Sequence, residues 1–290
     1  MEYDNAISTL KENLDYLSSR EQTVKSQLHS TLRSTAEIVY NSFSEFSIEP
    51  LLDKFQNAIK TNFTSDSIFL CEALLSKKER RTEIEKILGH DAETTAAGTH
   101  GKIAYTKNKL NDMAFESFSC YIRSAKAVTV STFNDACESV NNGESEFCIL
   151  PIEKSDDGKL FGFYALLDRY ELKIKRVCDV DADDSSHTVR YALVGKKSFM
   201  FDEHLRSLSD FILEFSIITA NGSFFAEMMI AAELCCATPI SIDSKPLPYN
   251  SQLKKYFFSF ALSQNNAVLM QLWLSLCYES FSLIGLYPEI

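Results

Sequence analysis

The chain has 290 residues, of which 45% are hydrophobic and 24% charged, and its formal net charge is −11. This length allows two or three domains with a sizeable core, and the composition is ordinary for a globular protein. The negative charge excludes a basic footprint for nucleic acid or anionic lipid. The 8 cysteines form no CxxC pair and mostly lie in apolar runs. They predict free thiols in a reducing, cytoplasmic setting, with no metal site and no cofactor.

Residues 1–90 are predicted to form a helical domain. They contain one proline, Pro50, and no glycine before Gly89. Apolar residues recur at helical spacing along residues 3–43 and indicate one long amphipathic helix. Further helices are expected to begin at Pro50 and at residues 64–66, the latter ending at Gly89. The long helix cannot bury its apolar stripe alone, so it needs these helices or a second copy of the chain.

A second block, residues 97–197, alternates short predicted strands and helices. Strands are expected at residues 126–131, 146–152, 172–180 and 188–195, and helices at 133–141 and 160–170. This alternation favours a mostly parallel sheet. The stretch CILPIEKSDDG, residues 148–158, ends a strand in a polar loop, which is where α/β folds place ligand sites.

A third block, residues 208–290, has the order β-α-β-β-α-β of a ferredoxin-like domain. Strands are expected at residues 211–218, 238–244, 254–262 and 281–288, and helices from residue 224 and at 265–280. The apolar stretch AVLMQLWLSLCYESFSLIGL is interrupted by polar residues, so we expect a buried helix and a strand instead of a membrane span. A ferredoxin-like sheet often pairs edge to edge or face to face with another copy, which predicts a homodimer.

The stretch TFNDACESVNNGESEFCILPIEKSDDGKL (residues 132–160) has a Gly-Glu turn and a strand, followed by Pro-Ile-Glu-Lys-Ser and Gly-Lys. It resembles the signature of the prephenate dehydratase family, in which the same turn and strand precede Pro-Ile-Glu-Asn-Ser and Gly-Ser. GTHGKIAYTKNKL (residues 98–110) is similar to its opening Gly-Pro-x-Gly-Thr-Phe-Ser loop, and TVRYALVG (residues 188–195) to its Thr-Arg-Phe strand. ANGSFFAEM, DSKP and LIGLYP resemble the ACT regulatory domain that follows in this family.

The resemblance implies an α+β or α/β multidomain chain. Its expected parts are a chorismate mutase-like helical domain (residues 1–90), one lobe of a periplasmic-binding-type dehydratase domain (97–197) and an ACT-like domain (208–290). The family has a second lobe that closes the active site. Here VCDVDADDSSHTVRYALVG passes almost directly from one strand of the first lobe to its returning strand, so the second lobe is expected to be missing.

The chemical residues of the family are also altered. Its Thr-Arg-Phe segment reads Val189-Arg190-Tyr191 here, so the hydroxyl that the resemblance links to water expulsion is absent. Thr188 is one residue away, and a one-residue slip on a strand points a side chain to the other face. The resemblance carries the dehydratase-like site to Glu153, Ser155, Thr188 and Arg190. Lys102, Lys154 and Lys159 are expected around the loop, as a rebuilt pocket for an anion or as a solvated face.

A mutase-like site would need basic residues around a dicarboxylate, because its catalysis is electrostatic. Lys11, Lys25 and Arg33 fall within ~80° of one another on a helical wheel. They are the candidates for this role if any mutase activity is present, whereas the common explanation of such residues is that long basic side chains border an apolar stripe.

The ACT-like resemblance implies a site for an amino acid such as phenylalanine. The candidate ligand-binding residues are Asn221, Gly222 and Ser223 in a turn, and Asp243, Ser244 and Lys245 in the next segment. Gly222 would let the backbone approach a ligand closely. The same residues could serve only to make a turn and to end a strand.

These observations predict a shortened protein of this family, linked to phenylalanine and aromatic amino-acid biosynthesis. Its dehydratase site is expected to be degenerate, and its role that of an amino-acid-sensing or regulatory homodimer. The alternative is an active chorismate mutase, a prephenate dehydratase (a lyase), or both, acting on a small anion such as chorismate or prephenate. A third possibility is a structural dimer without a ligand. None of these involves nucleic acid or a membrane.

Overall fold

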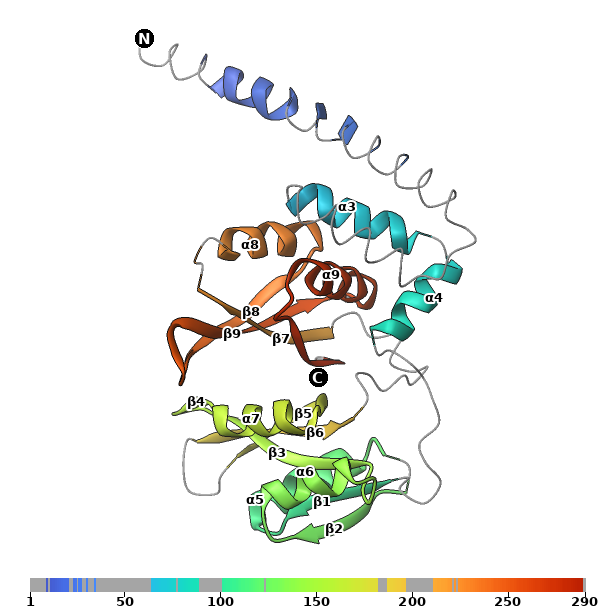
Figure 1. Cartoon of the computed structure of the whole chain (residues 1–290), viewed down its shortest axis with the longest axis vertical. Helices are drawn as coiled ribbons and strands as arrows, with labels where there is room; N and C mark the ends of the chain where they lie inside the picture. The colour runs from blue at the N-terminus through green and yellow to red at the C-terminus, as the bar shows by residue number, and fades with distance from the viewer. Residues whose placement is uncertain are drawn as a thin grey trace. The chain divides into compact units, whose positions relative to one another are not determined.

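The computed structural model describes residues 64–76, 78–88, 101–122, 124–181, 187–196, 211–220, 222 and 224–288, with scattered positions between residues 9 and 34. The chain divides into two compact units, Met1–Glu83 and Ile84–Ile290. Figure 1 labels the helices and strands of both units. Each unit is described by itself.

The described residues of the first unit are helical, apart from a turn at Ser76. Residues 11–20 form an exposed helix in which Leu14 and Leu17 are 58% and 59% exposed. The helix expected to begin near residue 64 is interrupted: α3 spans Thr64–Leu75 and α4 spans Lys78–Ile87, continuing into the second unit. The helix expected from Pro50, and the end of the long helix near residue 43, lie outside the described residues.

The second unit begins with a block that we call the lobe, residues 102–195. Its elements are β1 (Lys102–Thr106), α5 (Lys109–Ser119), β2 (Lys126–Val130), α6 (Phe133–Asn141), β3 (Phe147–Lys154), β4 (Gly158–Lys159), α7 (Phe161–Tyr170), β5 (Lys173–Asp181) and β6 (Thr188–Gly195). The helix predicted at 133–141 is confirmed, and a capping box of Thr132 and Asp135 explains its start. β1 and α5 occupy the segment that the sequence indicated as an opening loop.

The C-terminal block, residues 211–288, follows in the predicted element order, and we call it the ACT-like block after the sequence prediction. It contains β7 (Phe211–Thr219), α8 (Phe224–Leu234), β8 (Thr238–Leu247), β9 (Asn250–Leu262), α9 (Gln264–Cys277) and β10 (Ser282–Pro288). The expectation of a buried helix and a strand for the apolar stretch near the end is confirmed by α9 and β10. Among the described helices, none has both the length and the apolar character needed to cross a membrane.

The ten strands described in the second unit belong to one mixed sheet, in the order β2-β1-β3-β6-β5-β10-β7-β9-β8, with β4 paired to β3. Three pairs are parallel: β1 with β2, β1 with β3, and β5 with β10. The other pairs are antiparallel, so the expectation of a mostly parallel sheet is wrong. The reason in the lobe is the short connection 182–187, which returns β6 antiparallel to β5, because a parallel return needs a crossover of a dozen or more residues.

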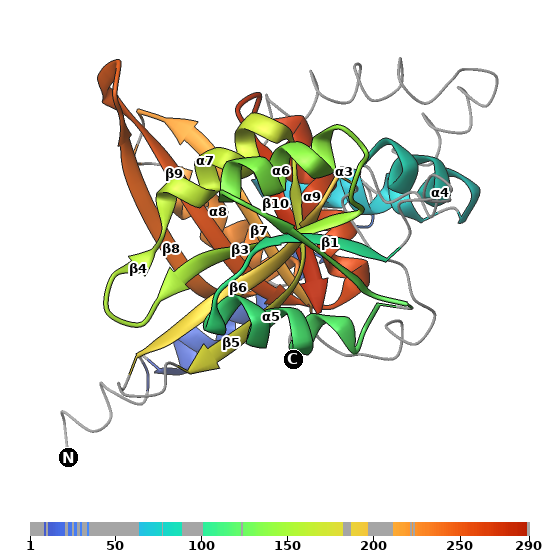
Figure 2. The same cartoon turned by 90° about the horizontal axis from the view of Figure 1, so that it is seen from below.

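Helices cover both faces of the lobe's part of the sheet (Figure 2). One face carries a core to which α6 and α7 contribute Ala136, Cys137, Tyr164 and Leu167. The other face carries a core to which α5 contributes Ala114 and Phe118. Alternation along each strand sends successive side chains to these two cores.

The lobe and the ACT-like block share a sheet and a core. A Cβ atom on Gly285 of β10 would lie 2.7 Å from Cβ and 2.9 Å from O of Ile174 on β5, so only glycine allows the two strands to approach this closely. Phe257, Ile284 and Tyr287 of the ACT-like block belong to the same cluster as the α6 and α7 residues. The two predicted blocks are therefore packed as one unit.

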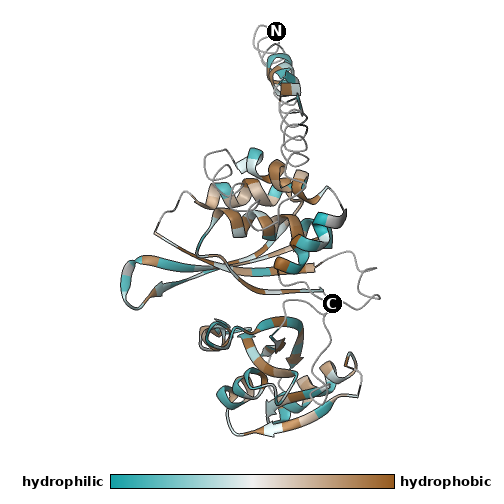
Figure 3. Cartoon of the chain, turned by 45° about the vertical axis from the view of Figure 1, so that its right-hand side comes forward, coloured by the Kyte–Doolittle hydropathy of each residue, from teal (hydrophilic) through white to brown (hydrophobic). Residues whose placement is uncertain are grey.

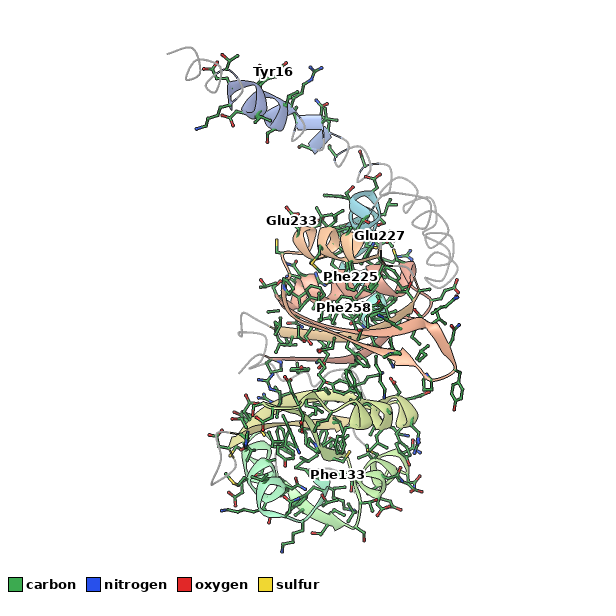
Figure 4. The ribbon with its side chains drawn as sticks, turned by 90° about the vertical axis from the view of Figure 1, so that its left-hand side faces the viewer. Tyr16, Phe133, Phe225, Glu227, Glu233 and Phe258 are labelled. Carbon is green, nitrogen blue, oxygen red and sulfur yellow. The ribbon has the colours of Figure 1, made fainter. Side chains whose placement is uncertain are left out.

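The other face of the ACT-like sheet is covered by α8 and α9 (Figure 3). Phe215 stacks between Phe258 and Phe260, at centroid distances of 5.2 and 5.9 Å. Phe225 of α8 lies above Phe258 at 6.1 Å (Figure 4). Phenylalanines thus fill the space between these helices and the strands.

Candidate functional site

Arg190 lies at the centre of a row of charged side chains on three neighbouring strands. Glu153 of β3 and Asp179 of β5 are its direct cross-strand partners. Arg190 Nε and Nη2 donate to Asp179 Oδ1 and Oδ2 at 2.8 and 3.0 Å, and Nη1 lies 3.8 Å from Glu153 Oε2. The hydrogen bond to Asp179 is the largest cause that raises the pKa of Arg190. The bidentate edge of this guanidinium is therefore already occupied by a carboxylate of the same chain.

A second row of polar side chains lies two residues further along β5 and β6 and at the residues that follow β3. Thr188 N donates to Ser155 Oγ at 3.1 Å, and Thr188 Oγ1 donates to Asp181 Oδ1 at 2.8 Å. Ser155 Oγ donates to Asp156 Oδ1 at 3.2 Å. Both hydroxyls of the predicted dehydratase-like set are thus bound to internal carboxylates.

The structure brings together the four residues predicted for the dehydratase-like site. Thr188 and Arg190 are two residues apart on β6 and share a face of the sheet, Glu153 is opposite Arg190, and Ser155 contacts Thr188. Val189, at the position of the missing hydroxyl, belongs to the core on the other face. The one-residue offset of the threonine therefore corresponds to a change of face.

The surface formed by these two rows is acidic. Its carboxylates are Glu153, Asp156, Asp179 and Asp181, and its basic groups are Arg190 and His187. His187 Nδ1 pairs with Asp156 Oδ2. Because the Ser155 hydroxyl donates to Asp156 and not to the imidazole, these three side chains do not form the nucleophile–base order of a serine hydrolase.

The three lysines expected around the loop do not converge. Lys154 is exposed and lies 3.9 Å from Asp157, whereas Lys159 is buried and paired with Glu214. Lys102 begins β1, next to the first residue of β3, and so lies at the opposite end of that strand from the loop. The interpretation of a lysine-lined pocket for an anion is therefore wrong.

Sequence reasoning missed the acidic partners and the residue that holds Lys159. Asp179 and Asp181 end β5 at alternate positions, a signal for side chains on one face. Glu214 interrupts the apolar strand FILEFSII, and a carboxylate in such a run signals a buried, paired charge. Neither signal identifies the partner, because the partner comes from a distant part of the chain.

The predicted mutase-like residues are described only in part. Lys11 is exposed on the helix of residues 11–20, and Lys25 and Arg33 lie outside the described residues. That site stays a prediction.

The predicted amino-acid site lies at one end of the ACT-like sheet. Lys254 of β9 pairs with Thr219 on one side and with Pro246 on the other, so the turn after β7 and the segment 243–246 flank the same strand end. Gly222 is exposed, and among the described residues no atom beyond its chain neighbours lies within 4 Å of a Cβ placed on it. Asn221 and Ser223 lie outside the described residues.

The segment 243–245 divides its side chains between two faces. Asp243 pairs with Phe257, whose ring lies 5.1 Å from that of Phe161 in the lobe, and Lys245 Nζ lies 5.8 Å from the centroid of Phe161. Ser244 pairs with Tyr256, whose ring contacts Phe225 at 5.1 Å. Ser244 is therefore the member of this set on the side of α8 and the Gly222 turn.

The described residues contain no group of three His, Cys, Asp or Glu side chains that could hold a metal ion. The cysteines of this part of the chain are free thiols. The acidic rows of the lobe are held together by hydrogen bonds from Arg190 and Thr188 and by the pairing of His187 with Asp156.

The chain was compared with known protein sequences and structures, and only solved structures are similar to it. No protein-family model matches the sequence, and no curated protein sequence matches it. The structure is similar to that of prephenate dehydratase from Streptococcus mutans, with a TM-score of 0.50, 14% identity, and coverage of 64% of this chain and 97% of that chain. It is also similar to GqqA, described as a novel type of quorum quenching acylase, with a TM-score of 0.51, 13% identity, and coverage of 65% and 95%.

A third structure, prephenate dehydratase in complex with L-Phe from Arthrobacter aurescens, has a TM-score of 0.49 at 13% identity, covering 65% of this chain and 90% of that chain. At these identities the likeness concerns the fold. The chain has a mixed α/β fold similar to that of prephenate dehydratase.

Proposed function

We propose that this chain is a regulatory protein with a prephenate dehydratase-like fold and a degenerate dehydratase site, which senses an amino acid as a homodimer in aromatic amino-acid metabolism. The observation that carries the first part is the ion pair of Arg190 with Asp179, at 2.8 Å. Prephenate is a dicarboxylate. The guanidinium is already paired, and the surface around it carries four carboxylates, which disfavour such a ligand by like-charge repulsion.

The hydroxyl groups of the site support the same proposal. Dehydration needs a donor aimed at the leaving hydroxyl. Thr188 Oγ1 donates to Asp181, and Ser155 Oγ donates to Asp156. The connection between β5 and β6, residues 182–187, is also too short to contain a second lobe that would close over this face.

The amino-acid site is proposed at the Gly222 turn. The open space at Gly222 lets a ligand carboxylate approach the backbone N–H groups that begin α8, and Ser244 supplies a hydroxyl from β8. Tyr256 and Phe225 form an aromatic wall beside Ser244. These features suit an aromatic amino acid.

Titration of the full chain with L-phenylalanine by calorimetry tests this site. We expect saturable binding that Gly222→Val weakens at least tenfold, because the added side chain occupies the open space at the turn. Gly162→Val is the matched control, since a Cβ on Gly162 in α7 also meets no atom within 4 Å. Absence of binding to the unaltered chain, or equal loss in both variants, contradicts the proposed site.

The homodimer is proposed at the outer edge of β8. β8 is the last strand of the described sheet, and its Ile240 and Ile242 are 48% and 43% exposed. The open face of the ACT-like sheet is not available for pairing, because Phe257 there packs against Phe161 and Tyr164. Edge-to-edge pairing about a two-fold axis at Ser244 would place Asp243 of each copy opposite Lys245 of the other.

Light scattering with size-exclusion chromatography measures the assembly. Ile242→Lys is expected to give a monomer, and Tyr249→Lys, at a fully exposed hairpin tip, is expected to leave the dimer intact. A monomeric unaltered chain, or a dimeric Ile242→Lys variant, contradicts this interface. The alternative of an active mutase or dehydratase is tested by turnover, as described at the end of the Discussion.

A further inference from the structure

A buried polar cluster connects the ACT-like block with the lobe. Lys159 Nζ of β4 donates to Glu214 Oε1 of β7 at 2.6 Å, and the two side chains are 6% and 1% exposed. Tyr164 OH of α7 donates to Glu214 Oε1 at 2.9 Å, and Tyr287 OH of β10 donates to Glu214 Oε2 at 3.0 Å. Lys159 Nζ also donates to Tyr164 OH at 3.2 Å.

The two tyrosine hydroxyls of this cluster keep their protons. Burial is the largest cause that raises the pKa of both Tyr164 and Tyr287 well above its usual value, and Glu214 adds to the effect. Both hydroxyls therefore remain donors at neutral pH. Glu214 accepts three hydrogen bonds, which offset the removal of its charge from water.

The cluster lies in apolar surroundings. Phe257 packs against Tyr164 at 5.4 Å, and Ile212 of β7 packs on the same core. Well-packed apolar residues in place of a buried ion pair are often as stable as the pair or more so. Stability alone therefore does not explain why Lys159 and Glu214 are charged. The directional hydrogen bond between them would instead fix the position of β4.

Lys159 is at the end of the loop that carries the predicted dehydratase-like residues. β4 pairs with β3 through Lys159 opposite Glu153 and Gly158 opposite Lys154. The residues between the two strands are 155–157, which include Ser155 and its partner Asp156. Holding Lys159 from β7 therefore holds both ends of this hairpin.

We propose that Glu214 is a positioning residue for the β3–β4 loop, and that through Lys159 it transmits the state of the ACT-like sheet to the face of Glu153 and Ser155. This goes beyond the proposed function, which assigns a role to each site without a connection between them. The proposal requires no bound ligand, because Lys159 and Glu214 are both residues of this chain. β7 and β10 supply Glu214 and Tyr287, so a displacement of either strand changes the anchor of β4.

The experiment is hydrogen–deuterium exchange by mass spectrometry on the full chain. In Glu214→Gln we expect exchange in peptides covering residues 153–160 to become about tenfold faster, a factor that corresponds to about 1.4 kcal/mol. Ser216→Ala is the matched control. Ser216 is on the same strand and face, fully buried, and its Oγ has no hydrogen-bond partner among the described residues. It should leave the loop unchanged.

Two further measurements separate positioning from general weakening. Tyr287→Phe removes one donor to Glu214 and leaves Lys159 in place. It should accelerate hydrogen–deuterium exchange in the same peptides, but by less than Glu214→Gln does. It also replaces Glu214→Gln as the test if that variant does not fold. The imidazole NMR signal of His187, which pairs with Asp156 in the loop, should shift in Glu214→Gln and Tyr287→Phe but not in Ser216→Ala.

Faster exchange confined to the loop, with a shifted His187 signal, supports the proposal. Unchanged loop exchange in Glu214→Gln overturns it. Faster exchange spread evenly over all peptides of residues 84–290 overturns it as well, because the pair would then only stabilise the fold.

Discussion

Two ion pairs of the second unit differ chiefly in their exposure to water. Lys159 and Glu214 are 6% and 1% exposed, whereas Arg190 and Asp179 are 42% and 49% exposed. The first pair joins the lobe to the ACT-like block and recruits two tyrosine hydroxyls. The second joins neighbouring strands on an open surface.

The difference teaches which pair affects folding and which affects ligand binding. Removing one partner of a buried pair leaves a charge without compensation in a poor solvent, so the fold is weakened. Removing one partner of an exposed pair leaves a charge that water solvates, so stability changes little. The same exposure lets the second pair decide what the surface can bind.

The largest expected effect is that of Lys159→Met. It leaves the buried Glu214 carboxylate with two neutral donors, and we expect the free energy of unfolding in urea to fall by about 3–5 kcal/mol. Lys154→Met, which removes an exposed pair at 3.9 Å, should cost less than about 1 kcal/mol. A loss below about 1 kcal/mol for Lys159→Met would remove the distinction between the two pairs.

Alkaline pH should weaken the buried cluster next. Tyr164 and Tyr287 have a raised pKa in the folded chain, while in the unfolded chain each titrates near about 10. Above that pH the unfolded state loses protons that the folded state keeps, so stability falls as pH rises. Each tyrosine contributes about 1.4 kcal/mol per pH unit. Between pH 10 and pH 11 the free energy of unfolding in urea should fall by about 1 kcal/mol less in Tyr287→Phe than in the unaltered chain, because this tyrosine in the unfolded chain is already about half deprotonated at pH 10. An equal fall would argue against the burial of Tyr287.

Gly285→Ala tests the contact that brings the two blocks together. The added Cβ would meet Ile174 Cβ and O at 2.7 and 2.9 Å, and backbone cannot yield as a long side chain can. We expect a loss of about 1–3 kcal/mol in the free energy of unfolding. Gly162→Ala in α7 has open space and should be neutral or slightly stabilising. Equal stability of both variants would contradict the close approach of β5 and β10.

The smallest effect is expected for Asp179→Asn. The pair is half-exposed, so the free energy of unfolding should fall by about 0–1 kcal/mol, and 1 M salt should reduce that difference further. The measurement is urea unfolding at low and high salt. A loss above about 2 kcal/mol would mean that this surface is structural.

Local patterns in the sequence predicted many single elements. The capping residue Thr132 and the glycine-containing turn at residues 141–143 define α6, and the polar interruptions of the last apolar stretch separate α9 from β10. β1 was not predicted. Its segment, Lys102–Thr106, was interpreted as the opening loop of the family, although its apolar residues are typical of a strand. The hairpin of β8 and β9 is longer than predicted. β8 continues to Leu247 and β9 begins at Asn250, because main-chain pairing extends both strands beyond the residues whose composition favours a strand.

The candidate site was predictable only in part. Glu153, Ser155, Thr188 and Arg190 were found through motif similarity, and pairing of β3 with β6 brings them together. What these four residues can bind depends on Asp179, Asp181 and Glu214, which come from other segments of the chain. Strand register and side-chain direction decide these contacts, and neither can be read from one segment alone.

Turnover of prephenate and chorismate tests most directly the claim that the lobe site is degenerate. The purified full chain is incubated with each compound, and products are followed by mass spectrometry without acid, because acid alone converts prephenate to phenylpyruvate. The account predicts that both compounds remain unchanged, since Arg190 is paired and the hydroxyls of Ser155 and Thr188 are engaged. Phenylpyruvate formed from prephenate, and lost in Arg190→Gln, would contradict it. Prephenate formed from chorismate would instead establish an active mutase.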